Sequence, residues 1–366
     1  MHIRFVREEL LKPLSYVAGV VERRQTLPIL SYLLLSQENE VVELTGTDLE
    51  VEVIARARAE AAGSGKVTVP ARKLLDICRA LPAEAVLDIR KEGDKVVVKA
   101  GRSRFALTSL PVADFPNLET TKWDLTVGLT QGDLKQALEQ THFCMAQQDV
   151  RYYLNGLLLE LRAGMLRLVG TDGHRMAMTE VPLENAPAGE RQVIMPRKGV
   201  HEISRLLEPN SDAVELRWSG NHLQAHTGAF TFTSKLIDGR YPDYTKVLPT
   251  QQGKAVVVDR TELREALGRA AILSNEKYRG VRLGLSQNSL KLSAHNPEQE
   301  EAQEEVAAEY QGEPLEIGFN VTYLMDAIGA LVSDQVRIGL NDPNSSCLIG
   351  APGSTYPQYV IMPMRL

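Results

Sequence analysis

The sequence has few cysteines, and they lie far apart. Cys78, Cys144 and Cys347 form no CxxC pair, and no group of histidines stands near any of them. An odd number of cysteines at such spacing argues against a disulfide framework and against a zinc site. We therefore expect three reduced thiols in the core, and neither a metal nor another cofactor.

Long apolar runs are missing as well. No segment approaches the roughly 18 consecutive apolar residues that suggest a membrane span. The N-terminal segment MHIRFVREELLKP has charges spread through it, where a secretory signal needs a continuous apolar stretch. We therefore expect a cytoplasmic protein that has no contact with a membrane.

A surplus of positive charge is also absent, because the net charge is −6. This value argues against a generally basic coat for nucleic acid, although a small basic face is compatible with it. The chain has no HExxH, GxxxxGK[ST] or G-x-S-x-G signature, and its carboxylates do not cluster at a metal-binding spacing. We therefore expect no catalysis. Two alternatives stay open: a nuclease or hydrolase that acts on DNA, and a repeat scaffold that binds only proteins.

The composition that is present is typical of a folded, multidomain protein. The chain has 366 residues, of which 43% are hydrophobic and 24% are charged. This balance excludes a largely disordered chain. A single hydrophobic core seldom grows beyond roughly 250 to 300 residues, so we expect two or three domains.

One structural plan occurs three times along the chain. Three segments open with a strand-like run and continue with helical periodicity: IRFVREELLKPLSYVAGV, LTVGLTQGDLKQALEQTHF and VVVDRTELREALGRAAIL. Their apolar anchors recur at i, i+4 and i+8, a spacing that lines one face of a helix. The anchors are Leu10, Leu14 and Ala18 in the first copy, Leu134, Leu138 and His142 in the second, and Leu263, Leu267 and Ala271 in the third.

A second helix is predicted in each copy, in VTVPARKLLDICRALP, VIMPRKGVHEISRLLEP and EIGFNVTYLMDAIGALV. Pro70 and Pro196 stand just before two of these helices, where a missing backbone donor does no harm, and Asn320 can cap the third. Alternating strand-like runs fill the rest of each copy. The sequence therefore predicts α+β domains, each with two helices packed on antiparallel sheets. We expect these domains to span residues 1–122, 123–248 and 249–366.

A repeated tripeptide explains a motif that at first resembles a catalytic pair. In TDGHR, Asp172 and His174 could form an acid–base pair. However, the Gly-Thr-Asp of residues 46–48 recurs at residues 170–172. We therefore interpret both tripeptides as the same turn, and only the Gly-His-Arg that follows is particular to the second copy.

Nine stretches, in order and from end to end, resemble the β sliding clamps of bacterial DNA polymerase III. They are TLPIL (26–30), LTGTDLE (44–50), VPARK (69–73), GRSRF (101–105), QQDVRYYLNG (147–156), TDGHR (171–175), ILSNEKYRG (272–280), NPEQEEA (296–302) and MPMRL (362–366). The resemblance implies repeated DNA-clamp domains that close into a ring as a head-to-tail homodimer. Such a ring encircles duplex DNA without sequence-specific contacts and makes a polymerase processive.

The resemblance also implies the partners. They are double-stranded DNA, a second copy of the chain, the catalytic subunit of the replicative polymerase, and a clamp loader. The loader would hydrolyse the ATP, because the chain itself has no nucleotide-binding motif. Translesion polymerases, ligase and mismatch-repair proteins would bind through short peptides of the Q-L-x-L-F type.

DNA contact is implied for residues that match the family's motifs. These are Arg24, Arg72, Gln148, Tyr152, Tyr153 and Lys198. Four predicted helices, at residues 7–24, 71–79, 197–208 and 260–277, carry fourteen Lys or Arg against nine Asp or Glu, whereas the whole chain is negative. For the two tyrosines, which stand at the start of a strand, a place in the core is the alternative.

A partner-peptide pocket is implied by a second set of matching residues. It consists of Leu154, Thr171, Gly173, His174, Arg175, Met176, Pro242, Lys246, Val247, Ser346, Val360, Met362, Pro363, Met364, Arg365 and Leu366. An apolar pocket with few polar anchors suits partners that share a short motif and differ elsewhere. Two positions depart from the family: Lys246 stands where Arg is common, and Met176 replaces a usual Leu. Residues 347–358 are rich in glycine and proline, so their path remains open.

A dimer interface is implied by two groups of opposite charge. The basic group is Lys73, Lys95, Arg102 and Arg104 beside Phe105 and Leu107, and the acidic group is Glu298, Glu300, Glu301 and Glu304 beside Ile272 and Leu273. Exposed ion pairs contribute little each, so we expect apolar contacts to supply most of the affinity and the charges to set the orientation. Without the resemblance, the acidic run is interpreted as a solvated strand edge.

Overall fold

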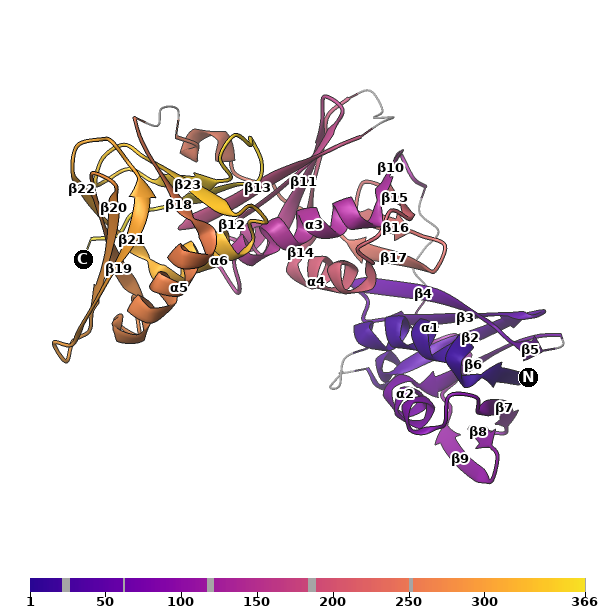
Figure 1. The fold of residues 1–366 in the computed structure, drawn as a ribbon. Helices are drawn as coiled ribbons and strands as arrows, with labels where there is room; N and C mark the ends of the chain where they lie inside the picture. The colour runs from indigo at the N-terminus through magenta and orange to yellow at the C-terminus, as the bar shows by residue number, and fades with distance from the viewer. Residues whose placement is uncertain (22–26, 62, 117–121, 184–188, 250–252, 366) are drawn as a thin grey trace. The chain divides into compact units, whose positions relative to one another are not determined.

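The computed structural model describes residues 1–21, 27–61, 63–116, 122–183, 189–249 and 253–365. These residues form six α-helices and three antiparallel sheets (Figure 1). The chain separates into two compact units, one of Met1–Gly132 with Lys198–Leu236 and one of Asp133–Arg197 with Ile237–Leu366. Each sheet lies within one unit.

The first unit contains two sheets. The five-stranded sheet has the order β5 (Glu60–Ala61), β1 (His2–Val6), β7 (Val86–Glu92), β8 (Lys95–Ala100) and β9 (Ser103–Thr108). The eight-stranded sheet has the order β10 (Leu125–Thr130), β15 (Ala213–Trp218), β16 (His222–His226), β17 (Phe230–Lys235), β4 (Val51–Arg58), β3 (Val41–Thr47), β2 (Tyr32–Glu38) and β6 (Ser64–Pro70). Helices α1 (Arg7–Val20) and α2 (Ala71–Ala80) pack on each other, and α1 covers β3 and β4.

The second unit is built on one twelve-stranded sheet. Its order is β14 (Arg191–Pro196), β11 (Gly156–Arg162), β12 (Met165–Thr171), β13 (Arg175–Pro182), β25 (Gln358–Ile361), β24 (Cys347–Gly350), β23 (Gln335–Leu340), β18 (Lys254–Asp259), β21 (Glu301–Glu309), β20 (Ser289–His295), β19 (Gly280–Ser286) and β22 (Leu315–Asn320). Helices α5 (Arg260–Ala270) and α6 (Val321–Gly329) pack together, and α5 lies on β20 and β21. The remaining helices, α3 (Gln131–Thr141) and α4 (Arg197–Leu206), begin where one unit gives way to the other.

The predicted helix anchors are confirmed with two exceptions. Leu10, Leu134 and Leu263, like the anchors one turn later, are at most 2% exposed. His142 and Ala271 are the exceptions, because α3 ends at Thr141 and α5 ends at Ala270. Each of these two residues begins a short 3₁₀ helix, η3 (His142–Cys144) and η6 (Ala271–Leu273). The cap predicted for α6 is confirmed as well, since the Asn320 side chain accepts hydrogen bonds from the backbone N–H groups of residues 322 and 323. Two helices on antiparallel sheets, the predicted plan, are thus present in each copy.

All three cysteines are buried free thiols, as the sequence predicts. Burial raises the pKa of the Cys78 and Cys144 thiols above the ordinary value, and it raises that of Cys347 to about 12. Within the described ranges, no group of three or more His, Cys, Asp or Glu side chains is placed to hold a metal ion. No helix among those residues is long and apolar enough to cross a membrane.

The repeated glycine has a structural reason in both copies. A Cβ at Gly46 would meet the Val17 carbonyl oxygen at 2.9 Å, and one at Gly170 would meet the Thr141 carbonyl oxygen at 2.6 Å. Both distances are shorter than a carbon and an oxygen tolerate. Glycine at these two places therefore lets the end of the first helix of each copy approach the sheet closely.

Replacing Gly170 by alanine should lower the free energy of unfolding by about 2 kcal/mol, because the new methyl group overlaps helix backbone that cannot move aside easily. Urea unfolding would measure this change. Gly128→Ala is the matched control, because a Cβ there has no neighbour within 4 Å, and it should change stability by less than about 1 kcal/mol. Equal losses for the two variants would contradict the close-approach explanation.

Candidate peptide pocket, DNA contacts and dimer edges

The TDGHR motif is a turn closed by its own side chains. The Thr171 hydroxyl donates to the Arg175 carbonyl oxygen at 2.7 Å and accepts from Gly173 N–H at 3.1 Å. The Asp172 carboxylate accepts from the N–H groups of His174 and Arg175 at 2.9 and 3.0 Å. The turn needs a positive φ at its third position, and Gly173 has φ +87°.

The first copy contains the same turn. The Thr47 hydroxyl donates to the Val51 carbonyl oxygen at 2.9 Å, and the Asp48 carboxylate accepts from the N–H groups of Glu50 and Val51. Leu49 takes the place of Gly173, with φ +79°. The interpretation of Gly-Thr-Asp as a shared turn is confirmed, and Asp172 serves the backbone instead of acting as a partner for the His174 ring.

Arg175 follows this turn and connects it to two distant segments. Its guanidinium donates to the Asp172 carboxylate at 3.1 Å, to the Asp326 carboxylate of α6 at 2.6 Å and to the Phe143 carbonyl oxygen of η3 at 2.8 Å. It also lies 4.4 Å from the centre of the Tyr323 ring. Only 13% of the side chain is exposed. Burial disfavours the charged form, but the surrounding acidic groups outweigh this effect and raise the pKa of Arg175.

An apolar cluster lies beside the turn and brings several predicted pocket residues together. Leu154, Met176 and Val360 are buried in one cluster with Val169 and Tyr241. The contact exists because β25 pairs with β13, with Met176 opposite Val360. Directly after the strand, the Met362 N–H donates to the His174 carbonyl oxygen at 2.9 Å. This joins the end of the described chain to the TDGHR turn.

The segment before residue 249 contributes further residues of the predicted peptide pocket. The short helix η5 (Tyr244–Val247) contains exposed Lys246 and Val247, and exposed Pro242 precedes it. The Asp243 side chain caps η5 by accepting from the Thr245 N–H. The Thr245 hydroxyl and then Lys246 lower the pKa of this carboxyl.

The structure does not bring all the predicted pocket residues to one place. Met364 and Arg365 line a separate hollow of about 370 Å³ with Tyr278, His295 and Pro297. The Met364 N–H donates to the Gly318 carbonyl oxygen at 2.9 Å. Half-buried Pro363 lies between the two places, half-buried Ser346 immediately precedes β24, and Leu366 lies outside the described residues. The path of residues 347–358, left open by the sequence, is β24, a turn and the start of β25.

The residues predicted to contact DNA differ in their solvent exposure and in the bonds that they already form. Tyr152 is 56% exposed, whereas Tyr153 packs partly buried against the apolar cluster. Arg72 is exposed and donates to the Val21 carbonyl oxygen at 2.9 Å, and half-buried Lys198 forms an ion pair with Asp48. Gln148 is exposed with φ +56°. Arg24 lies outside the described residues.

The predicted dimer residues form two groups, one at α2, β8 and β9 and one at residues 272–273 and 298–304. Arg104 and Phe105 are on β9, where Leu107 is buried and Phe105 is half-buried, while Lys95 begins β8 and exposed Lys73 is on α2. On the acidic side, Ile272 is 76% exposed and Leu273 is half-buried. Glu298, Glu300 and Glu301 are exposed.

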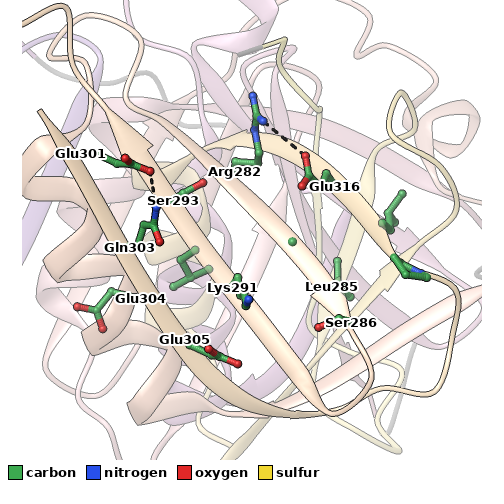
Figure 2. A pocket seen from close by; sticks show the side chains of 14 residues that line it. Arg282, Leu285, Ser286, Lys291, Ser293, Glu301, Gln303, Glu304, Glu305 and Glu316 are labelled. Carbon is green, nitrogen blue, oxygen red and sulfur yellow. Dashed lines mark hydrogen bonds and ion pairs between the residues drawn. The ribbon is translucent and has the colours of Figure 1, made fainter. Parts of the chain in front are cut away.

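Glu304 differs from the other predicted acidic residues because it forms an ion pair within the described part of its own chain. Its carboxylate accepts two hydrogen bonds from Arg269 of α5, at 2.9 and 2.7 Å. The Arg269 guanidinium lowers the pKa of this carboxyl. Figure 2 shows the other face of the strand, where Glu301, Gln303 and Glu305 project beside Lys291 into a hollow of about 720 Å³.

Three residues near the pocket were missed by the sequence interpretation: Phe143, Tyr323 and Asp326, which surround Arg175. One signal could have found Asp326, because it is the single charged residue in the apolar helix VTYLMDAIG. A carboxylate in such a helix needs a partner. The partner itself, 151 positions away in the sequence, could not be predicted from spacing.

Replacing Asp326 by asparagine should lower the free energy of unfolding by about 1 to 2 kcal/mol, because a charge-assisted hydrogen bond from the largely buried Arg175 guanidinium is lost. Urea unfolding measures the effect. The control is Glu316→Gln, which breaks an exposed ion pair with Arg282 at 3.5 Å, and it should cost less than about 0.5 kcal/mol. If the control were as costly as Asp326→Asn, Arg175 would not connect these segments in the way described.

Models of known families match the chain in three consecutive segments. The N-terminal domain of the DNA polymerase III beta subunit matches residues 1–119, the central domain matches residues 128–243, and the C-terminal domain matches residues 245–365. The beta sliding clamp of Pseudomonas aeruginosa is 55% identical to the chain over 100% of both sequences. That of Escherichia coli K12 is 49% identical over 98% of both.

Solved structures agree with the sequence comparisons. A crystal structure of the DNA polymerase sliding clamp from Pseudomonas aeruginosa has a TM-score of 0.97 and 54% identity, with 100% of both chains covered. Caulobacter crescentus pol III beta has a TM-score of 0.94 and 38% identity, again with 100% of both chains covered. Another clamp structure from Pseudomonas aeruginosa was solved bound to griselimycin.

The repeated domains, each with two helices on antiparallel sheets, define a DNA-clamp fold. The chain belongs to the DNA polymerase III beta subunit family. Its function is that of a DNA sliding clamp, a processivity factor of DNA replication with no catalysis of its own. The enzyme alternative is thereby set aside, as is a scaffold that binds only proteins.

Proposed function

We propose that the chain forms a head-to-tail homodimeric ring around duplex DNA, built from domains at residues 1–122, 123–248 and 249–366. The single observation that carries this proposal is a pair of open strand edges of opposite charge, one in each unit. The ring would tether the replicative polymerase and other DNA-processing proteins.

The first open edge is that of β9. This strand ends its sheet and pairs only with β8, with Val98 opposite Phe105 and Val96 opposite Leu107. Among the described residues, no strand pairs with its other side. Exposed Arg104 lies on it, and exposed Arg102 immediately precedes it. An edge with free N–H and C=O groups is a template for another strand.

The second open edge belongs to the first part of β21. Residues 301–307 pair with β20, whereas β18 on the other side reaches only residues 308 and 309. The open stretch carries Glu301 and Glu305, and Glu298 and Glu300 precede it. Within the described residues, no strand pairs with this side of residues 301–307. The backbone there is therefore available for an antiparallel partner strand.

Joining these two edges in different copies gives a heterologous contact. Such contacts either close into a ring or continue as a fibre, and two identical contacts between two chains make a closed dimer. The basic β9 edge and the acidic β21 edge attract each other, whereas two copies of the same edge repel. Apolar contact would come from exposed Ile272 with Leu273 on one side and from Phe105 with Leu107 on the other. Glu304, bound to Arg269, would contribute less than its neighbours.

Replacing both Ile272 and Leu273 by alanine should raise the dissociation constant of the dimer about 100-fold, because apolar anchors supply most of the affinity at such an interface. Analytical ultracentrifugation across a concentration series would measure it. Val332→Ala is the control, because Val332 is 78% exposed and lies outside the proposed edge. A double variant as dimeric as the control would refute the proposed interface.

Sliding on DNA needs loose electrostatic contact. We propose that Arg72, Gln148, Tyr152 and Lys198, together with Arg24, face the duplex, and that Tyr153 mainly supports Tyr152, whose ring centre lies 5.7 Å away. Lysine and arginine attract phosphates without reading sequence, so the ring can move along the duplex. Lys198 must share its charge with Asp48, so it contributes less than Arg72.

Loading the protein onto a nicked circular plasmid with a clamp loader and ATP should give a complex that survives gel filtration at about 0.5 M salt, because salt screens phosphate contacts but leaves a topological link intact. Cutting the circle with a restriction enzyme should release the protein. Retention on the linear product would contradict a ring, and loss from the intact circle would do so as well.

The peptide pocket is proposed from the TDGHR turn, the apolar cluster and η5. Buried Leu154, Met176 and Val360 would support an apolar floor, which suits the Leu-Phe end of a Q-L-x-L-F peptide. His174 and Met362 lie at its edge, where the glutamine end would bind. The polymerase, the clamp loader, translesion polymerases, ligase and mismatch-repair proteins would share this pocket. We place the protein in the cytoplasm, where bacterial DNA is replicated.

A further inference from the structure

A charged network is buried under the pocket, in the sheet formed by β11, β12 and β13. Arg167 on β12 stands directly opposite Glu160 on β11 and Glu180 on β13. Its guanidinium donates to Glu180 at 2.6 Å and to Glu160 at 3.4 Å. The exposed fractions of these three side chains are 18%, 12% and 6% for Arg167, Glu180 and Glu160. Two largely buried carboxylates thus share one arginine. Their remaining oxygen lone pairs require further hydrogen-bond donors.

The further donors come from β14 and from η5. Gln192 of β14 donates to Glu160 at 2.5 Å. The Tyr244 hydroxyl accepts from Arg167 at 2.8 Å and donates to Glu160 at 2.5 Å. Tyr356 lies close to the other carboxylate, because burial and then Glu180 raise the pKa of its phenol. Burial, followed by the hydrogen bond to Glu160, raises the pKa of Tyr244 to about 12, so the phenol remains a donor at neutral pH.

These two tyrosines begin the segments that form the pocket walls. Tyr244 is the first residue of η5, which carries Lys246 and Val247. Tyr356 stands two residues before β25, which carries Val360 and leads to Met362. The network therefore holds the base of η5 through the bond from Arg167 to Tyr244, and Glu180 of the same network lies close to Tyr356 before β25, more than 100 residues away in the sequence.

We infer that Arg167 is a positioning residue for the peptide pocket: it touches no peptide, but it fixes η5 and the approach to β25 at the separation that the peptide requires. This inference rests on the pocket proposed above. A buried ion network is a weak source of net stability, because desolvation offsets most of the attraction. Its fixed geometry is what an apolar replacement would lack, so the network acts on the spacing of the walls.

Binding of a fluorescently labelled Q-L-x-L-F peptide to the full-length protein, measured by anisotropy, tests this role. Tyr244→Phe removes a single oxygen atom and keeps the ring in the apolar cluster. It should weaken peptide binding about tenfold, because η5 loses its bond to the buried network. Arg167→Lys should weaken it at least as much, since an ammonium is a point charge that cannot replace the planar fork.

Tyr359→Phe is the matched control. It makes the same substitution in β25, and within the described residues the buried Tyr359 hydroxyl has no hydrogen-bond partner. Peptide affinity of this variant should stay within about twofold of the original protein. Amide hydrogen exchange adds a readout that general loosening would not give: in Tyr244→Phe, exchange should rise in residues 244–248 and stay unchanged in α5.

Each result decides between distinct claims. If the original protein binds the peptide and Tyr244→Phe binds it equally well, Arg167 has no positioning role, while the pocket stands. Equal weakening by Tyr244→Phe and Tyr359→Phe would also overturn the role, because loss of core packing would then explain both. If the original protein does not bind the peptide at all, the proposed pocket itself is wrong, and the inference falls with it.

Discussion

The pairing of β25 with β13 is the interaction on which the rest of the second unit depends. Four residue pairs, from Arg175 with Ile361 to Met178 with Gln358, join the last strand of the chain to a strand of the central segment. This ladder turns two groups of strands into one twelve-stranded sheet. The apolar cluster with Met176 and Val360, the bond from Met362 to His174 and the contact of Arg175 with α6 all require it. Packing, and not catalytic chemistry, therefore creates the candidate pocket.

The proposed functional features lie where the copies differ. The turn at Asp48 and the turn at Asp172 have the same hydrogen bonds, yet only the second is followed by a histidine and an arginine that reach other segments. The open acidic edge belongs to the third copy and the open basic edge to the first. In the proposed ring, the places where the repeat is broken would give the copies different partners.

Local patterns in the sequence predicted the elements and failed at long-range contacts. The helix anchors, the Asn320 cap and the Gly-Thr-Asp turn follow from spacing and side-chain chemistry within a few residues, and the structure confirms them. The helical anchors His142 and Ala271 were wrong, because a helix end depends on one residue and periodicity does not fix it. Arg167 and its two glutamates lie opposite one another through strand register, and Arg175 meets Asp326 through the fold, so neither contact is visible in the sequence.

Recognition of a known family contributed what spacing could not, but it treated the site as one group of residues. The structure divides that group, because Met364 and Arg365 line another hollow and the Arg175 guanidinium already binds the carboxylates of Asp172 and Asp326. A crystal structure of the protein with a Q-L-x-L-F peptide tests the central claim most directly. The account predicts peptide density over Met176 and Val360, with one end beside His174 and Met362. Density only at another surface, with this place empty, would contradict it.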